Sequence, residues 1–368
     1  MEKIKTILIK GELKGRGIVN FDDKEQRRIL SKHGIANGKL EENVKLGKKV
    51  FYKTGKFKED GTEIYDYKIK ISGDCLRKNI FDNDMEVTSS YLIQDPFILG
   101  TYMLSPVGVM RGYGFIAKDE TLKDKSPLTV TDAIQVNNAK SELEIGTTTG
   151  ERSDTSMFFT EKAGDMVYKF KGQISMKQLQ FLSADPCFDR LAINPDLISS
   201  GDADIILNNH YGDKANVEYG IFSSMGKYSS NSYGEYGIRL NDELCEIVIK
   251  DTLKNILSVN ISRNNAYAAT SALKIKLVDN IIGIGQKMED EENWIELKTE
   301  ADVDALELSN IYSFYEKATD EEVEMRKKMI DEYNEKSSNK KAEKDAKKAE
   351  KEAKKAAKKK GVEVSKID

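Results

Sequence analysis

The sequence predicts an α+β protein. Segments such as Tyr65–Ile71 alternate apolar and polar residues with the period of two that marks a half-buried strand. Other segments have helical spacing and recognisable ends; Asn241–Val259, with Asp242 near its start, is one of them. Long stretches rich in polar residues, Gly or Lys separate these elements. Strands and helices therefore come in mixed order, with large insertions between them.

Composition limits the class of protein. The chain has 368 residues, a net charge of −4 and 39% apolar residues, which is enough for a core. No run of about 18 apolar residues suggests a membrane span, and the charged start MEKIKTILIK lacks the apolar stretch of a signal peptide. Three scattered cysteines indicate a reducing compartment, so we expect a cytoplasmic protein. The two isolated histidines form no Cys/His cluster, so we expect neither a metal nor a cofactor.

The first strand is predicted at Lys3–Leu13. It ends where glycines separate Lys14 and Arg16, and such glycines allow a ligand close to the backbone, although a simple turn explains them equally well. Residues from about 33 to 64 read as an inserted lobe, with a strand at Val44–Phe51.

A short helix is predicted to follow Ser72, which can cap it. The helix runs to Phe81, and its first amides together with Arg77 and Lys78 are a candidate phosphate site. A capped helix with a solvated face is the alternative. A second helix begins at Asp95-Pro96, with Pro in its favoured first position.

Two regions after that helix predict short strands. Val107–Ala117 reads as a strand with Arg111 between glycines, and Asp204–Leu207 reads as another. Lys227 and Tyr228 lie in a stretch that interleaves basic and aromatic residues, which suits base stacking but also an ordinary surface loop. Leu273–Val278 and Asp279–Gly285 read as closing strands.

A long polar hairpin is predicted between about 128 and 175. One strand begins at Leu128, and the other, Met166–Ile174, places Tyr168 on one face and Lys169 on the other. The polar stretch between them ends in an apolar tip, Met157-Phe158-Phe159. Loops of this length are usually functional or disordered.

The chain ends in a capping box at Thr319–Glu322, its helix, and a tail over 337–368. Lys336–Lys360 holds 12 lysines against four acids, a net charge of +8, and leaves −11 for residues 1–335. Residues 340–360 of the tail include no apolar residue larger than Ala and cannot pack a core, so this stretch is either solvated or a contact for nucleic acid or a partner. The acidic body argues against a non-specific nucleic-acid binder, although basic residues gathered in one groove would still bind.

The hairpin carries a resemblance to a known family. Asp132-Ala133 after a short strand, the turn T-T-G-E-R, the exposed Met157–Phe159, then E-x-A-G and an alternating strand resemble the RAMP superfamily of CRISPR proteins. Within it, the sequence resembles the Cas-seven family of guide-RNA backbone subunits, of the type I-F variant or type IV branch. In that family the hairpin is a thumb that reaches over the next subunit.

The resemblance implies a fold and a function. The fold would be a ferredoxin-like or RNA-recognition-type palm over 1–285, with the 33–64 lobe and the 128–175 thumb inserted, followed by a helical extension over 286–336. The function would be non-catalytic: a filament of copies along a crRNA that presents the guide to target DNA or RNA, with other CRISPR effector subunits and no membrane. The guide would pair with the target, so the protein needs contacts to the backbone only.

The resemblance also implies contact residues. The thumb wedge would be Met157, Phe158 and Phe159. The RNA-binding residues would be Lys14, Arg16, Ser72, Arg77, Lys78, Arg111, Lys140, Arg152, Lys227 and Tyr228.

Two other classes of function remain open. Type III members of the superfamily cut target RNA with an aspartate in a loop before the first helix, and Asp22 and Asp23 lie in a comparable place. Carboxylates in a polar loop are more often solvated than catalytic. A self-assembling scaffold that binds no RNA would suit the acidic body.

Overall fold

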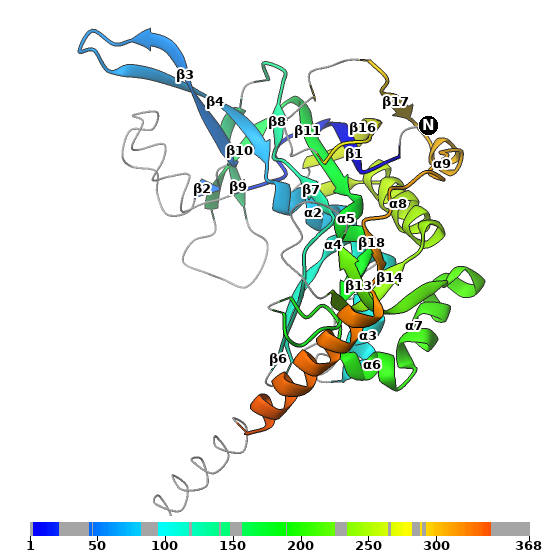
Figure 1. Cartoon of the computed structure of the whole chain (residues 1–368). Coiled ribbons are helices and arrows are strands. Elements are labelled where there is room, and N and C mark those ends of the chain that lie inside the picture. The colour runs from blue at the N-terminus through cyan, green and yellow to red at the C-terminus, as the bar shows by residue number, and fades with distance from the viewer. Residues whose placement is uncertain are drawn as a thin grey trace, which may run out of the picture.

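The computed structural model describes residues 3–21, 44–45, 47–81, 95–117, 120–139, 141–147, 157–188, 190–224, 234–263, 266–281, 288 and 292–339. Apart from one short parallel pairing, its sheets are antiparallel, and they are packed with helices (Figure 1), which confirms the α+β prediction.

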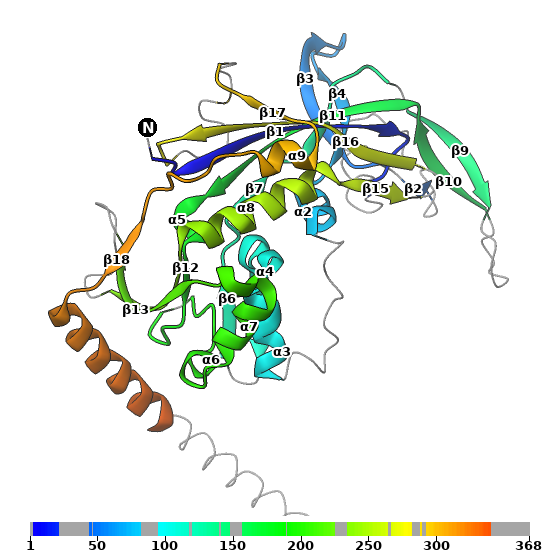
Figure 2. The same cartoon turned by 90° about the vertical axis from the view of Figure 1, so that its right-hand side faces the viewer.

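The largest sheet forms the upper layer of the molecule in Figure 2. Its strands run in the order β15-β16-β1-β11-β8-β4-β3, with β7 paired to β11 and β17 paired to β16, all antiparallel. The bounds in that order are Asn260–Arg263, Ala266–Val278, Thr6–Arg16, Asp165–Ser175, Ala133–Gln135, Glu63–Ile71 and Lys49–Phe57, with Leu128–Val130 for β7 and Ile295–Leu297 for β17.

Helices α2 (Gly73–Phe81) and α8 (Asp242–Leu257) lie against one face of this sheet (Figure 2). Strand alternation sends Ile7, Ile9 and Leu13 of β1 toward these helices, where they are fully buried. The predicted alternation of β11 is confirmed, because Tyr168 is buried and Lys169 is exposed. Asn241 caps α8 by accepting from the Leu244 amide over 2.8 Å.

Two hairpins project from this sheet. Strands β3 and β4 form one of them, and β9 (Ser141–Thr147) and β10 (Met157–Ala163) form the other. A short strand, β2 (Val44–Lys45), pairs in parallel with β10.

Most of the remaining elements lie below α2 and α8 in Figure 2, whereas α9 lies between α8 and the large sheet. A four-stranded sheet has the order β12-β14-β13-β18, and β5 pairs with β6. The strand bounds are Phe181–Ser183, Glu235–Leu240, Val217–Ser224, Tyr315–Lys317, Tyr113–Ala117 and Glu120–Asp124. The helices are α3 (Pro96–Met103), α4 (Pro106–Arg111), α5 (Met176–Leu179), α6 (Pro195–Ser199), α7 (Asp202–Tyr211), η3 (Gly212–Lys214), α9 (Glu300–Asp304), and a further helix over 320–339.

The strand predicted at Val107–Ala117 is wrong over its first half, which is helix α4. Ser105 caps this helix by accepting the Gly108 amide over 3.0 Å, Pro106 supplies its first residue, and Gly112 ends it with a φ of 67°. These cap signals outweigh the apolar run that suggested a strand.

Two other strand predictions need correction. Asp204–Leu207 lies inside helix α7, where Ala203, Ile206, Leu207 and Tyr211 are buried at helical spacing. The strand starting at Leu273 is part of the longer β16, whereas residues 279–281 lie outside any strand and 282–285 fall outside the described residues. Among the helices of the described ranges, none is long and apolar enough to cross a membrane.

Candidate nucleic-acid interface

The face of the large sheet that faces away from α2 and α8 is lined with lysines. Residues paired across antiparallel strands share a face, so Lys10 of β1 lies between Lys171 of β11 and Lys274 of β16. One row along, Leu8 pairs with Lys276 and Gln173. We call Lys10, Lys14, Lys169, Lys171, Lys274 and Lys276 the lysine face.

Three adjacent lysines on neighbouring strands repel one another and cost the fold stability. Lys10 Nζ lies 4.4 Å from the centroid of the Trp294 ring. Within the described part of the chain, Lys171 and Lys274 form no ion pair. Such a row is relieved by an anion that spans several strands, because the bound charge turns the repulsion into attraction.

One acid interrupts the lysine face. Glu12 lies 3.3 Å from Lys14 Nζ and 3.9 Å from Lys169 Nζ, and its Oε1 accepts a hydrogen bond from Ser271 over 3.1 Å. Both lysine side chains are 62% exposed, so these pairs contribute little to stability and leave both ammonium groups accessible. Arg16 continues the face to the end of β1, opposite Asp165 and Tyr267.

The start of α2 lies beside the end of β1. The Asn20 side-chain amide is 3.5 Å from Ser72 Oγ, which confirms the predicted cap by accepting the Cys75 amide over 3.4 Å. The first amide of the helix is already hydrogen-bonded to a carboxylate. Asp132 accepts hydrogen bonds from the Gly73 amide over 2.9 Å and from Lys70 Nζ over 2.6 Å. Although partial burial opposes it, these hydrogen bonds hold the pKa of Asp132 below its usual value.

Two of the predicted amide donors at this helix start are thus already used. Lys78 remains exposed and Arg77 partly exposed, with the Arg77 guanidinium 3.7 Å from Asp74. Arg111 lies at the end of α4, which contacts α2 on the helical side of the sheet. The predicted contacts therefore lie on two sides of the large sheet. Lys14 and Arg16 are on the lysine face, and Arg77, Lys78 and Arg111 are on the side that α2 and α8 cover.

The β9–β10 hairpin begins where β1 ends. The Gly17 amide donates to the Gly164 carbonyl over 3.0 Å, and Gly164 joins β10 to β11. Met157, Phe158 and Phe159 begin β10, and Met157 pairs with Thr147, the last residue of β9. The predicted apolar tip is therefore the end of this hairpin that is remote from the large sheet.

Some predicted residues fall outside the described ranges: Lys140, Arg152, Lys227, Tyr228, Asp22 and Asp23. Of the two histidines, His210 lies on α7 and contacts the Thr101 carbonyl over 2.8 Å. Across the described residues, no group of three or more His, Cys, Asp or Glu side chains is arranged to hold a metal ion.

Of the lysine face, sequence reasoning predicted only Lys14 as a contact and missed the other five lysines: Lys10, Lys169, Lys171, Lys274 and Lys276. A signal was present, because Lys68-Ile69-Lys70, Lys169-Phe170-Lys171 and Lys274-Ile275-Lys276 each repeat lysines around a buried residue. Each triplet indicates a strand with a basic outer face. Only the register of the strands shows that Lys10, Lys171 and Lys274 are neighbours.

The comparison with protein families decides the family. The family model described as "Type I-Fv CRISPR-associated protein Cas7fv-like" matches residues 3–302. The chain belongs to this Cas7fv-like family. The family assignment confirms the resemblance to the Cas-seven backbone subunits. No curated protein matches the chain.

Solved structures with a distant likeness to this Cas7fv-like chain carry CRISPR titles. A "CRISPR RNA-guided surveillance complex" has 12% identity and a TM-score of 0.35, covering 84% of this chain and 78% of that chain. A "CRISPR RNA-guided surveillance complex, pre-nicking" has 8% identity and the same TM-score, covering 76% and 80%.

Proposed function

We propose that the chain is a non-catalytic backbone subunit of a CRISPR surveillance complex, several copies of which assemble along a crRNA. The observation that carries this proposal is the row Lys274–Lys10–Lys171, which puts three lysines side by side on the sheet face that faces away from α2 and α8. Phosphates of one strand provide the repeated negative charge that such a row needs.

The topology supports a ferredoxin-like or RNA-recognition-type palm. Chain order is β1, α2, β8, β11, α8 and β16, and the sheet order of the four strands is β16-β1-β11-β8. Both helices lie on one face, and the lysine face is the opposite one, which is the face that an RNA-recognition-type sheet turns toward RNA. Part of that face is covered, because Trp294 lies over Lys10 and Leu8 is fully buried. The palm would span residues up to 285, with the 33–64 lobe inserted and 286–336 as an extension.

The guide would cross the lysine face and leave the sheet beside Arg16. There it would meet the α2 start, where Arg77 and Lys78 add charge, and the base of the β9–β10 hairpin. We infer that this hairpin is the thumb, which reaches the next copy and places Met157–Phe159 against unstacked bases. The guide would pair with target nucleic acid, and other subunits would complete the complex.

Charge reversal tests this proposal. A chain carrying Lys171→Glu and Lys274→Glu should bind a guide-length RNA about tenfold more weakly or worse at low salt, because two phosphate contacts become repulsive. Lys214→Glu, on the exposed η3, is the matched control and should leave the affinity unchanged. Equal RNA affinity in the double variant and the control would overturn the assignment of this face.

A further inference from the structure

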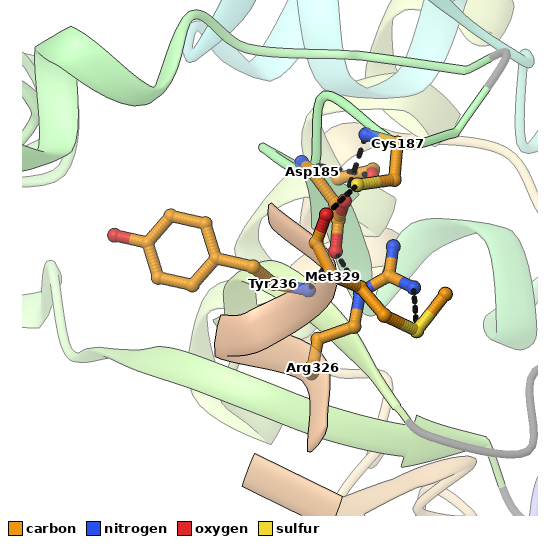
Figure 3. A network of polar contacts seen from close by, with 6 residues as sticks. Asp185, Cys187, Tyr236, Arg326 and Met329 are labelled. Atoms are coloured by element: carbon orange, nitrogen blue, oxygen red, sulfur yellow. Dashed lines mark hydrogen bonds and ion pairs between the residues drawn. The ribbon is translucent and has the colours of Figure 1, made fainter. Parts of the chain in front are cut away.

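The last helix, over 320–339, is fixed to the body of the chain by a buried ion pair (Figure 3). Arg326 donates through Nε to Asp185 over 2.6 Å, and these side chains are 4% and 0% exposed. Asp185 also accepts the backbone amides of Cys187 and Tyr236, over 3.0 and 3.1 Å. The Tyr236 ring points away from this contact in Figure 3. The helix is therefore held beside β14, the strand that carries Tyr236.

The start of the same helix is fixed as well. Glu322 accepts the Thr319 amide over 2.8 Å, and Thr319 accepts the Glu322 amide over 3.3 Å, which confirms the capping box. Glu322 also accepts a hydrogen bond from Ser223 of β13 over 3.2 Å. The direction of the helix is therefore set by the four-stranded sheet.

A groove of about 1840 Å³ lies between this helix and the four-stranded sheet. Its helix wall carries Val323, Ile330 and Tyr333, whose spacing puts them on one side of the helix. Val323 and Ile330 are half-buried, and Tyr333 is 44% exposed. The opposite wall includes Ile221 and Phe222 of β13. Two apolar walls therefore face each other across the groove.

The groove runs along an open edge of β13. Strand β14 pairs with one side of β13, and β18 pairs with the other side only over residues 222–224. The last bond on that side joins the Ala318 amide to the Ile221 carbonyl over 3.0 Å. Backbone groups two residues apart point to the same side of a strand, so the amide and carbonyl of Tyr219 face this edge too. Among the described strands, none pairs with Tyr219 there, and both Tyr219 and Gly220 line the groove. Such an edge accepts a further strand.

The net charge of the groove is opposite to that of the whole chain. Its lining holds four lysines and two aspartates, a net charge of +2 in a chain of net charge −4: Lys123, Lys317, Lys327, Lys336, Asp196 and Asp331. Lys327 and Lys336 are exposed on the helix. Lys317 lies 3.3 Å from Glu218 but is 72% exposed, so its ammonium group stays accessible. Charge complementarity therefore favours an acidic occupant.

We propose that this groove binds an extended acidic segment of a partner protein, which adds a strand to the open edge of β13. The segment would pair with the backbone of Tyr219, and its alternate side chains would pack against Ile221 and Ile330. Its carboxylates would meet Lys327 and Lys336. A nucleic-acid strand fits less well, because the two aspartates repel phosphates and an open strand edge offers the hydrogen bonds of another peptide. Binding in this groove does not require RNA on the lysine face, because the groove lies against the other sheet.

Peptide binding to the full chain, followed by fluorescence anisotropy at low salt, tests the proposal. The probe is a short synthetic peptide that alternates Val with Glu. It should bind at least about tenfold more tightly than the same peptide with Lys in place of Glu, because the groove is positive. A version with methylated backbone amides, which cannot form the hydrogen bonds of a strand, should also bind at least about tenfold more weakly than the probe. If either altered peptide binds as tightly as the probe, or if the probe does not bind at about 1 mM, the proposal is overturned.

A pair of variants tests whether the probe binds in the groove. Lys327→Glu should weaken probe binding about fivefold or more, because an attractive contact becomes repulsive. Lys328→Glu is the matched control, since Lys328 is exposed on the same helix, does not line the groove and gives the same change in net charge. It should leave the affinity unchanged, and equal affinities of the two variants would overturn the proposal. If Lys327→Glu weakens binding of a single-stranded oligonucleotide and leaves the probe unaffected, the groove is a nucleic-acid site and the proposal fails.

Discussion

Gly15 of β1 packs directly against the backbone of Tyr267 on β16. A methyl group built at Gly15 would lie 1.8 Å from the Tyr267 carbonyl oxygen, so only glycine fits there. This contact joins the end of the central strand to its neighbour, beside Arg16 and the start of the candidate interface.

Gly15→Ala should therefore destabilise the protein. The expected cost is about 1–3 kcal/mol or more, because the backbone of β1 or β16 must shift to admit the methyl group. Gly114→Ala on β5 is the control, since nothing lies within 4 Å of its added methyl. Urea unfolding of both variants checks the prediction, which fails if the two have equal midpoints.

The buried pair of Arg326 and Asp185 predicts a second loss of stability. Arg326→Met leaves the Asp185 carboxylate buried without its cation, which typically costs about 3–5 kcal/mol. Lys327→Met removes the neighbouring but exposed charge and should change the free energy of unfolding by less than about 0.5 kcal/mol. Thermal unfolding of the two variants side by side would show this difference in stability. Similar melting temperatures would contradict a stabilising role for the Arg326–Asp185 pair.

Asp124 gives the protein a pH dependence. Burial raises the pKa of this carboxyl from its ordinary value of 3.8 to about 7, even though Arg190 opposes the shift. The folded state thus holds a proton that the unfolded state releases between about pH 4 and 7. Through this group alone, stability falls as pH rises across that window, by up to about 4 kcal/mol.

Asp124→Asn removes that titration. The variant should gain stability relative to the parent chain as pH rises from about 4 to 7, and the difference should level off above pH 7. Urea unfolding at a series of pH values measures it. Parallel profiles for the two proteins would contradict the assigned pKa.

Removal of the β9–β10 hairpin separates folding from assembly. Replacing residues 141–162 by a short glycine link should leave a folded monomer, because Asn137 still bridges to Asp165 and Val167 at the hairpin's base, over 2.7 and 3.1 Å. Shortening a loop costs little closure entropy. Assembly of several copies on guide RNA should be lost. Circular dichroism would test whether the shortened chain folds, and sedimentation would test whether it assembles. Full-length assemblies of the shortened chain would show that the hairpin is not a thumb.

Elements marked by alternation or by cap residues within their own segment were predicted correctly from the sequence. The alternation around Tyr168 gave β11, Asn241 gave the start of α8, and Thr319 with Glu322 gave the start of the last helix. The strand predicted at Val107 failed because an apolar run of that length suits both states, and the cap at Ser105-Pro106 decides between them.

The candidate interface was harder to predict from the sequence. Lys10, Lys171 and Lys274 are far apart along the chain, and only strand register makes them neighbours. Likewise, nothing local to Ser72 shows that Asp132 occupies the helix start next to it.

The central claim is that this chain holds a guide RNA, and the nucleic acid that it carries tests the claim most directly. The protein would be expressed with a matching CRISPR array, purified at low salt, and its bound nucleic acid extracted and sized. We predict RNA of guide length, held through phosphate contacts that weaken as salt rises. Protein with the absorbance ratio of a nucleic-acid-free chain, and no RNA on extraction, would contradict the account.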